Sequence, residues 1–569
     1  MIETGDYYHL FIDDIPRFSL ENFLENDIDA KNLIDFLDHI KAIVRTHWAD
    51  YMVSVFNDLP DSPKKTKLFN IFQSETSLRT ILDKEKFREL EMLRLVDEGE
   101  FWREIVTAIS EREIATIGLA KHFLDHLTKE QQENLSLSKQ EIDLFLDLSF
   151  SIQHFIDQAY IHQLALADEP GGKQVGTLPL EFGYEYLYDD KIPYSEVYSD
   201  EFTCLTETLN DFSNRIEQEV EDGLLSPDYL SLAHYLTTLS KSYGSKETNI
   251  EKINQIWEDV DREYISLAQQ GCPIILTPWG FLTDGNHIGI ELMVTLNLGS
   301  SSKWHKDSEI YRGLVRNFMR NYEPDFEPVP FIHQYVFVRN GLNIPWSGTA
   351  CASNRYVVFY DNENDNFSAN LYHSYYDEFI DGNTSENRFA YVRGLNTVAH
   401  ETGHLGRMLN QDLYQKMGNG VNINKLDEAK ADSMATLLFS KDLIQGNTDV
   451  TPSEFIEQYI VDYIDEIRGA RGHETEDLGI VWYDFSAKLM LLTLFESNSI
   501  IWSKDKIKII DGYSGMVAIA GVGKQIFNFY GDEHFDSQAV SLYIQNIEER
   551  VFRNADIQKF LAKVTIVHR

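Results

Sequence analysis

Nine consecutive residues, Asn396–His404 (Asn-Thr-Val-Ala-His-Glu-Thr-Gly-His), constrain the local fold of this chain more than any other segment. His400 and His404 are four residues apart, and Glu401 directly follows the first histidine. On a helix, residues four apart lie on the same face, so both imidazole rings can reach one metal ion. We therefore expect a helix that supplies His400 and His404 as zinc ligands. Glu401 would lie beside them as a general base for a water molecule.

A second segment, Leu426–Asp432, offers the remaining ligand. Its two acids Glu428 and Asp432 are again four residues apart, so they face one way on a helix. Glu428 can complete a His-His-Glu site that leaves the fourth zinc position open. Asp432 can accept the free ring N–H of a ligating histidine, which fixes the tautomer of that histidine. The sequence therefore predicts one zinc ion per chain, held by His400, His404 and Glu428.

The first of these helices carries two glycines, Gly403 and Gly406, in or next to the metal motif. A glycine in a helix costs up to ~1 kcal/mol relative to alanine, so it needs a reason to be there. We expect another segment to approach the helix closely at this point.

Composition narrows the class of protein further. With 569 residues the chain exceeds the ~250–300 residues at which single cores stop growing, so we expect at least two lobes. No window approaches the ~18 apolar residues of a membrane span, and the acidic segment Met1–Asp6 does not resemble a secretory signal. The cysteines are too few and too far apart for a disulfide framework: Cys204, Cys272 and Cys351. We expect a cytoplasmic protein.

The net charge of -42 bears on the partners. A surface this acidic repels phosphate backbones and anionic lipid, so neither nucleic acid nor membrane is an expected partner. The charge is also compatible with a plain solvated surface. The oligomeric state does not follow from the sequence.

Hydrophobic periodicity divides the chain into three regions. Residues 1–270 show mainly helical spacing, residues 271–384 are rich in short strand-like runs, and residues 385–569 are helical again. We expect strands at Pro273–Leu276, Ile288–Val294 and Tyr356–Tyr360. We expect a helix to begin at the capping signal Thr451–Glu454. Gly521–Lys524 is expected to form a turn. The predicted fold is mostly α with a smaller α+β lobe, in two lobes with a cleft between them.

Over roughly residues 270–560 the chain resembles the dipeptidyl peptidase III family of gluzincin metallopeptidases. Four segments carry the resemblance: Glu-Ala-Lys-Ala-Asp at 428–432, Leu-Asn-Ile-Pro at 342–345, Ile-Arg-Gly-Ala-Arg-Gly-His at 467–473, and Gly-Asp at 531–532. The likeness is to the shorter branch, which is often fused to Nudix domains, although this chain has no Nudix box.

The resemblance implies two further site residues and a substrate class. Asn343 would bind a peptide held as an added strand, and His473, in a segment that would open a helix, would contact the reacting carbonyl. Release of dipeptides from the N-terminus of oligopeptides would follow. The chain departs from the family pattern in three ways: it has Trp346 in place of an asparagine, one residue fewer than long-chain members between the histidines, and no tyrosine at the expected catalytic position.

The function expected from these observations is a zinc metallopeptidase that hydrolyses peptide bonds of oligopeptides. Two alternatives stay open. A non-peptidase zinc hydrolase would share all the metal residues, and a peptidase-fold binding module would keep zinc without turnover.

Overall fold

The computed structural model describes residues 31–58, 100–167, 184–187, 190–193, 198–247, 249–277, 281–284, 287–290, 292–338, 348–351, 355–406, 421–470, 478–532 and 534–564. The chain divides into two compact units. Unit 1 contains residues 1–297 and 336–344, and unit 2 contains residues 298–335 and 345–569. The division of the sequence at residues 270 and 384, like the cleft between lobes, stays a prediction.

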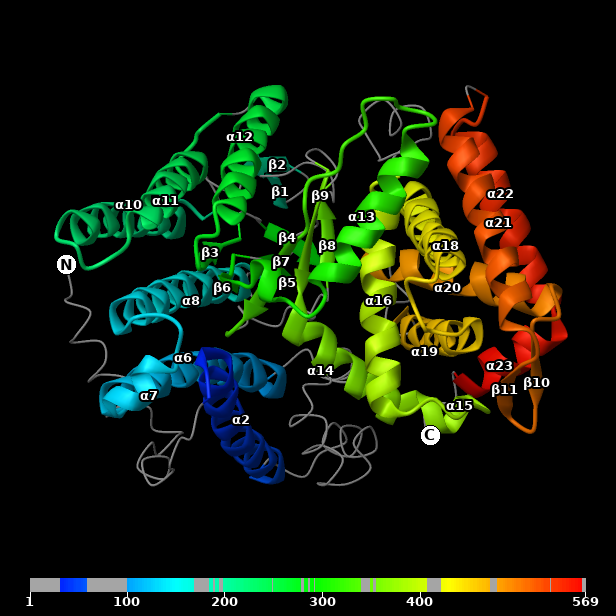
Figure 1. Ribbon diagram of the computed structural model, residues 1–569, viewed down its shortest axis with the longest axis horizontal. Coiled ribbons are helices and arrows are strands. Elements are labelled where there is room, and N and C mark those ends of the chain that lie inside the picture. Colours follow the sequence, from blue (N-terminus) through cyan, green and yellow to red (C-terminus); the bar gives the residue numbers. More distant parts are fainter. Residues whose placement is uncertain are drawn as a thin grey trace. The chain divides into compact units, whose positions relative to one another are not determined.

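Unit 1 is built mainly from helices, shown in blue to green in Figure 1. Their bounds are α2 (Leu33–Asp58), α6 (Glu100–His126), α7 (Lys129–Glu133), α8 (Lys139–Ala167), α10 (Ser199–Glu221), α11 (Leu230–Tyr243) and α12 (Ile250–Gln269). The helical spacing seen in the sequence corresponds to buried faces, because Leu33, Phe36 and Ile40 of α2 are all buried.

The strands of unit 1 form antiparallel pairs. Strand β1 (Tyr184–Leu187) pairs with β2 (Asp190–Pro193), β3 (Ile274–Leu276) with β6 (Val294–Asn297), and β4 (Phe281–Asp284) with β5 (His287–Ile290). The prediction of a single strand at Ile288–Val294 is wrong, because β5 and β6 are separate strands with different partners.

Unit 2 holds a short sheet and the helices from α13 onward. Strand β9 (Tyr356–Tyr360) pairs in parallel with β7 (Ile332–Val336) and antiparallel with β8 (Gly348–Cys351), and β8 lies at the sheet edge. The helices are α13 (His305–Met319), α14 (Asp361–Leu371), α15 (Asp377–Phe379), α16 (Glu386–His404), α18 (Val421–Gln445), α19 (Pro452–Ala470), α20 (Leu478–Glu496), α21 (Gly512–Gly531), α22 (Ser537–Arg553) and α23 (Ala555–Val564). Unit 2 also contains a 3₁₀-helix, η3 (Gly299–Ser301), and a π-helix, η4 (Tyr372–Tyr376). Strands β10 (Ile500–Ser503) and β11 (Lys506–Ile509) form an antiparallel hairpin.

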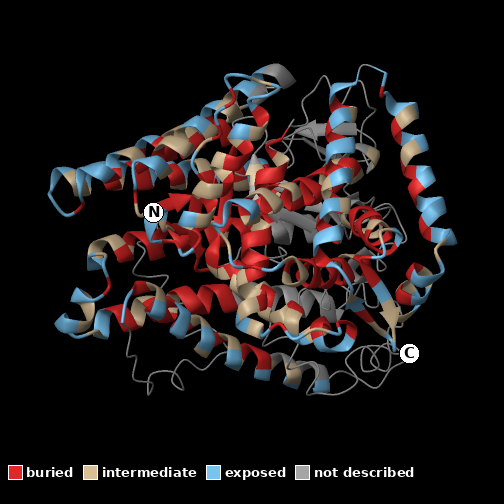
Figure 2. Ribbon diagram, turned by 45° about the vertical axis from the view of Figure 1, so that its right-hand side comes forward, coloured by how far each residue is buried: buried red, intermediate tan, exposed pale blue. Residues whose placement is uncertain are grey.

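The core of unit 2 surrounds α18, which packs against α16, α20 and α21 (Figure 1). Most described residues of α16, α18 and α20 are buried or half-buried, whereas α21 has one exposed face. Figure 2 colours the chain by this burial. The capping signal at Thr451–Glu454 is confirmed, because α19 begins at Pro452 and both capping hydrogen bonds are present. The turn expected at Gly521–Lys524 is wrong, since these residues lie inside α21.

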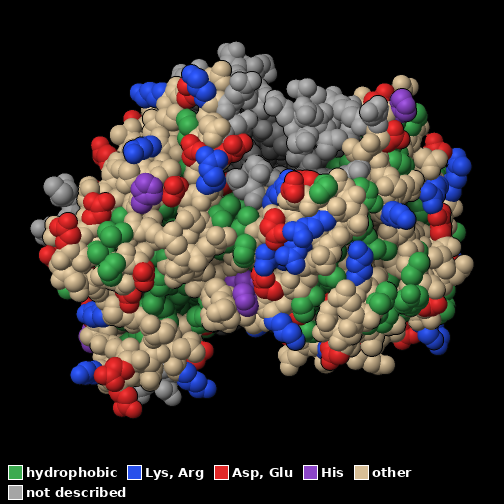
Figure 3. Space-filling model, turned by 45° about the horizontal axis from the view of Figure 1, so that its top comes forward, with side chains coloured by type: hydrophobic (Ala, Val, Ile, Leu, Met, Phe, Trp, Pro, Cys, Tyr) green, Lys and Arg blue, Asp and Glu red, His purple; other side chains and the backbone are tan. Residues whose placement is uncertain are grey.

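These elements confirm the predicted fold class of mostly α structure with a smaller strand-containing part. Among the described residues no helix has the length and apolar composition needed to cross a membrane. On the face shown in Figure 3, acidic and basic side chains are interspersed and do not form one large patch of a single sign.

Candidate metal centre

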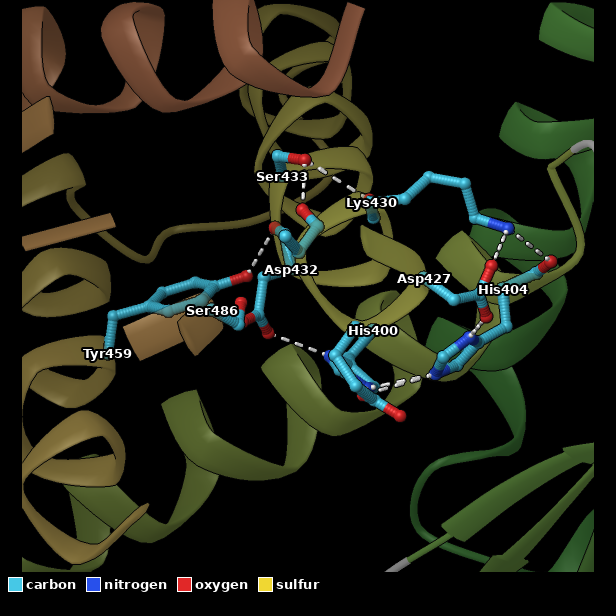
Figure 4. Close-up of polar contacts among 10 residues, drawn as sticks. His400, His404, Asp427, Lys430, Asp432, Ser433, Tyr459 and Ser486 are labelled. Atoms are coloured by element: carbon cyan, nitrogen blue, oxygen red, sulfur yellow. Dashed lines mark hydrogen bonds and ion pairs between the residues drawn. The ribbon is translucent and has the colours of Figure 1, made fainter. Parts of the chain in front are cut away.

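Helix α16 places the two histidines of the motif at its C-terminal end. Their Nε2 atoms are 3.2 Å apart and face each other, as expected for side chains one helical turn apart (Figure 4). Both rings are half-buried. His400 and His404 therefore present one nitrogen each to a common point.

Helix α18 brings Glu428 to the same point. The Oε2 atom of Glu428 lies 3.5 Å from Nε2 of His400 and 3.7 Å from Nε2 of His404. This oxygen is buried and has no hydrogen-bond partner. A buried carboxylate oxygen without a partner is costly unless a cation is placed beside it. Within the described part of the chain, these three side chains form a group that could hold a metal ion.

Glycine allows α16 and α18 to approach closely enough for this. A Cβ atom at Gly403 would lie 2.5 Å from the carbonyl oxygen of Ala431, closer than real Cβ contacts come. The close approach predicted at Gly403 is thereby confirmed. On the other side of α18, a Cβ at Gly523 of α21 would lie 2.8 Å from the hydroxyl of Ser433.

The ring of His400 is held in place by a hydrogen bond to Asp432 of α18. Nδ1 of His400 lies 2.8 Å from Oδ1 of Asp432, and Ser486 of α20 donates to the other oxygen of Asp432 at 2.5 Å (Figure 4). The hydroxyl of Tyr459 donates to the backbone carbonyl of Asp432 at 2.8 Å. With Nδ1 paired to a carboxylate, Nε2 is the nitrogen that faces Glu428 and His404.

Behind His404 lies a second carboxylate, Asp427, which sequence reasoning missed. Nδ1 of His404 lies 2.8 Å from Oδ2 of Asp427. The other oxygen of Asp427 accepts from Lys430 at 2.6 Å and from the hydroxyl of Tyr530 at 3.1 Å. An acid directly before Glu428 was the available signal, but nothing in the sequence shows which histidine it would reach.

Glu401 lies against the sheet edge and is 9% exposed. A Cβ atom at Gly348 of β8 would lie 3.1 Å from Cγ of Glu401, a tighter contact than is usual, so glycine gives this side chain room. Burial raises the pKa of Glu401 above its ordinary value, while the two histidines oppose the shift and Glu428 adds to it. A carboxyl group with a raised pKa is suited to general-base chemistry near neutral pH.

The electrostatics of the histidines reflect the surrounding acids. Burial disfavours the charged form of His400, but the neighbouring carboxylates of Asp432 and Glu428 outweigh it and raise its pKa well above the ordinary value. For His404, burial is likewise outweighed, here by Glu428 and Asp427, and the pKa is raised. The carboxylates around the two rings therefore favour a positive charge at this point.

Tyr483 of α20 shares this acidic environment. Burial raises the pKa of its phenol well above the usual value, and the charges of Glu428 and Glu401 raise it further. It lies one helical turn before Ser486, which hydrogen-bonds Asp432, so this face of α20 is directed toward α18. No motif surrounds Tyr483, so the sequence offered no reason to single it out.

Three residues from the sequence analysis lie outside the described residues: Asn343, Trp346 and His473. The prediction that the segment Ile467–His473 opens a helix is wrong for its described residues. Residues 467–470 close α19 instead of opening another helix.

The fold and the site together define a mostly helical protein with a His-His-Glu group, drawn from two adjacent helices, that could hold a metal ion. No protein-family model matches the sequence, and no curated protein matches it. Solved structures that are similar to this chain include two dipeptidyl-peptidase III enzymes. DPP III from Caldithrix abyssi is 12% identical with a TM-score of 0.46, covering 92% of each chain. Dipeptidyl-peptidase III from Corallococcus sp. strain EGB is 13% identical with a TM-score of 0.46, covering 95% of this chain and 92% of the other. Likeness at this level says nothing about the residues of the site.

Proposed function

We propose that this chain is a zinc-dependent peptidase whose metal ligands are His400, His404 and Glu428. The observation that carries the proposal is the convergence of two imidazole nitrogens and the unpartnered oxygen of Glu428, with a carboxylate behind each histidine. Two histidines and one carboxylate are a typical donor set for a zinc ion that keeps a position open. Calcium and magnesium prefer sites made of oxygen alone, so this set favours zinc.

A bound zinc ion would polarise a peptide carbonyl and bring the pKa of a water molecule toward ~7. The protein groups then have defined tasks. Asp432 and Asp427 accept the Nδ1–H protons of the two histidines and keep both Nε2 atoms free for the metal. Glu401 is assigned as base and not as ligand: its carboxylate takes a proton from water and passes it to the nitrogen of the leaving amine.

The position of Glu401 beside the sheet edge supports a peptide as the substrate. An extended peptide can add to an edge strand through backbone hydrogen bonds, and β8 is such a strand with Gly348 against Glu401. We assign Asn343, which precedes β8 in the chain, to binding of this peptide. His473 is assigned as a second donor to the reacting carbonyl. Both assignments rest on the family resemblance of their segments, as does release of dipeptides from a free N-terminus.

A matched set of peptides tests the function. Zinc-loaded wild-type protein and Glu401→Gln are incubated with oligopeptides that carry either free or acetylated N-termini, and products are identified by mass. Wild type should release dipeptides from the free peptides, while Glu401→Gln should leave both sets intact. Equal cleavage of both sets at internal bonds would replace dipeptide release by endopeptidase action. Zinc binding without cleavage of any peptide would leave either a hydrolase of other bonds or a binding module.

A further inference from the structure

The two histidines of the site are supported by carboxylates in different electrical settings. Besides His400, the carboxylate of Asp432 accepts from one neutral group, the hydroxyl of Ser486 at 2.5 Å. Asp427 accepts from a cation, the ammonium group of Lys430, at 2.6 Å. His400 is therefore supported by a carboxylate whose other donor is a neutral hydroxyl, and His404 by a carboxylate that also forms an ion pair with a lysine.

Lys430 is buried completely, with 0% of its side chain exposed. Lysine is almost never fully buried unless it is paired, because its charge is strongly hydrated in water. A buried ion pair is weak evidence for stability, since apolar residues of similar volume often stabilise as well or better. The burial of Lys430 beside the proposed metal site is therefore better explained by a role in the site than by stability alone.

The surroundings of the Lys430 ammonium group point toward His404. Besides Asp427, Nζ contacts the backbone carbonyl of His404 at 3.5 Å and lies 5.0 Å from the centre of the Tyr530 ring. Tyr530 itself donates to the same oxygen of Asp427 that accepts from Lys430. Lys430 and Tyr530 thus fix one oxygen of Asp427, which leaves the other oxygen directed at Nδ1 of His404 (Figure 4).

We propose that Lys430 is a positioning residue for the metal site: it holds Asp427 in place, and Asp427 in turn holds the ring of His404 with Nε2 toward the metal. The inference rests on the proposed zinc function. Without its cation, Asp427 is a buried carboxylate whose charge is no longer paired. Only Tyr530 then holds that oxygen in place, so the carboxylate can rotate and no longer orients His404.

A double-mutant cycle on zinc affinity tests this role. Zinc dissociation constants are measured by competition with a chromophoric chelator for wild type, Lys430→Met, Asp427→Asn and the double variant. Each single variant should bind zinc about 10–100-fold more weakly, the usual effect of losing a group that orients a ligand. The double variant should bind zinc at least as tightly as Asp427→Asn, because Lys430 has nothing left to position.

A matched control lies one helical turn and a residue earlier on α18. Lys425 also pairs with an acid, Glu548 at 3.4 Å, but Glu548 is 57% exposed and belongs to α22. Lys425→Met should leave zinc affinity within about twofold of wild type, since surface pairs contribute little. The visible spectrum of the cobalt-substituted protein gives a second measurement, which should change in Lys430→Met and stay unchanged in Lys425→Met.

Two results would overturn the proposal. Lys430→Met could bind zinc as wild type does, or the double variant could bind a further tenfold more weakly than Asp427→Asn, as two independent packing defects would. If Lys430→Met fails to fold, the zinc affinity of the double variant is compared with that of Asp427→Asn. The double variant should fold, because it removes both buried charges together, and this comparison then tests the proposal. Absence of zinc from wild type, by contrast, contradicts the proposed function itself.

Discussion

Gly403 of α16 lies directly against the backbone of Ala431 on α18, where a Cβ atom would come within 2.5 Å of the carbonyl oxygen. Ala431 stands between Lys430 and Asp432 and three residues after Glu428, so this contact sets the separation of the two helices at the proposed metal ligands. Because the opposing atoms belong to a helix backbone, they cannot move aside as a flexible side chain would.

Gly403→Ala should therefore destabilise the protein although alanine is the better helix former. Overpacking of this kind costs about 1–3 kcal/mol, which exceeds the up to ~1 kcal/mol gained in helix propensity. Zinc affinity should fall with it, because Glu428 moves away from the histidines. Urea unfolding and chelator competition measure the two effects. Gly118→Ala on α6 is the control, since nothing lies within 4 Å of that Cβ position, and it should be neutral or stabilising.

Glu401→Gln separates metal binding from chemistry. The amide keeps the volume of Glu401 but cannot accept a proton, so zinc content should be unchanged while peptide hydrolysis falls by a factor of about 100 or more. Glu428→Ala should lose both, because it removes a ligand. Metal analysis and turnover are measured on the same preparations. Wild-type turnover in Glu401→Gln would mean that another group accepts the proton.

Asp432→Asn tests the carboxylate behind His400. It keeps the shape of the side chain and removes the charge that supports the ring, so zinc affinity should fall about 10–100-fold with the fold intact. Ser486→Ala should have a smaller effect in the same direction, because it removes one neutral hydrogen bond to Asp432. Unchanged zinc affinity and turnover in Asp432→Asn would reduce this acid to a structural partner of Ser486.

A pH dependence of stability is expected at the start of α19. Glu454 caps this helix through Thr451 and pairs with Arg388 of α16 at 2.8 Å. Burial opposes the charged form of Glu454, but hydrogen bonds from Arg388 and Thr451 outweigh it and lower its pKa. A carboxyl with a lowered folded-state pKa stabilises the protein above its unfolded pKa of ~4.3, and this stabilisation is lost as pH falls through the folded value.

Glu454→Gln should thus lower the free energy of unfolding at pH 7 by about 1 kcal/mol or less, and the difference from wild type should shrink below pH ~4.3. Denaturant unfolding at pH 7, 5 and 4 measures it. Glu549→Gln is the control, because Glu549 forms an exposed pair with Arg553 on α22. A difference that grows toward acid pH would contradict the sign of this argument.

Features encoded by neighbouring residues could be predicted from the sequence. The spacing of His400 and His404, and of Glu428 and Asp432, sets which face of a helix each side chain occupies, and the structure shows these helices at α16 and α18. The strand at Tyr356–Tyr360 appears as β9 with the same bounds, because its β-branched and aromatic run is buried on both faces.

Features that depend on tertiary contacts could not be predicted. Gly523 resembles a turn residue by its neighbours, yet it lies within α21 because the helix must pass close to Ser433. Asp427 and Lys430 look like an ordinary ion pair three residues apart on a helix. The contact between Asp427 and His404, on which their proposed role rests, depends on the fold and not on the local sequence.

The metal content of purified protein tests the central claim most directly. His400, His404 and Glu428 should hold about one zinc ion per chain, measured by elemental mass spectrometry after dialysis against zinc and then against metal-free buffer. His404→Ala, prepared in the same way, should hold none while keeping its helical circular dichroism. Folded wild-type protein that retains no zinc after this treatment, or His404→Ala that retains a full equivalent, would contradict the account.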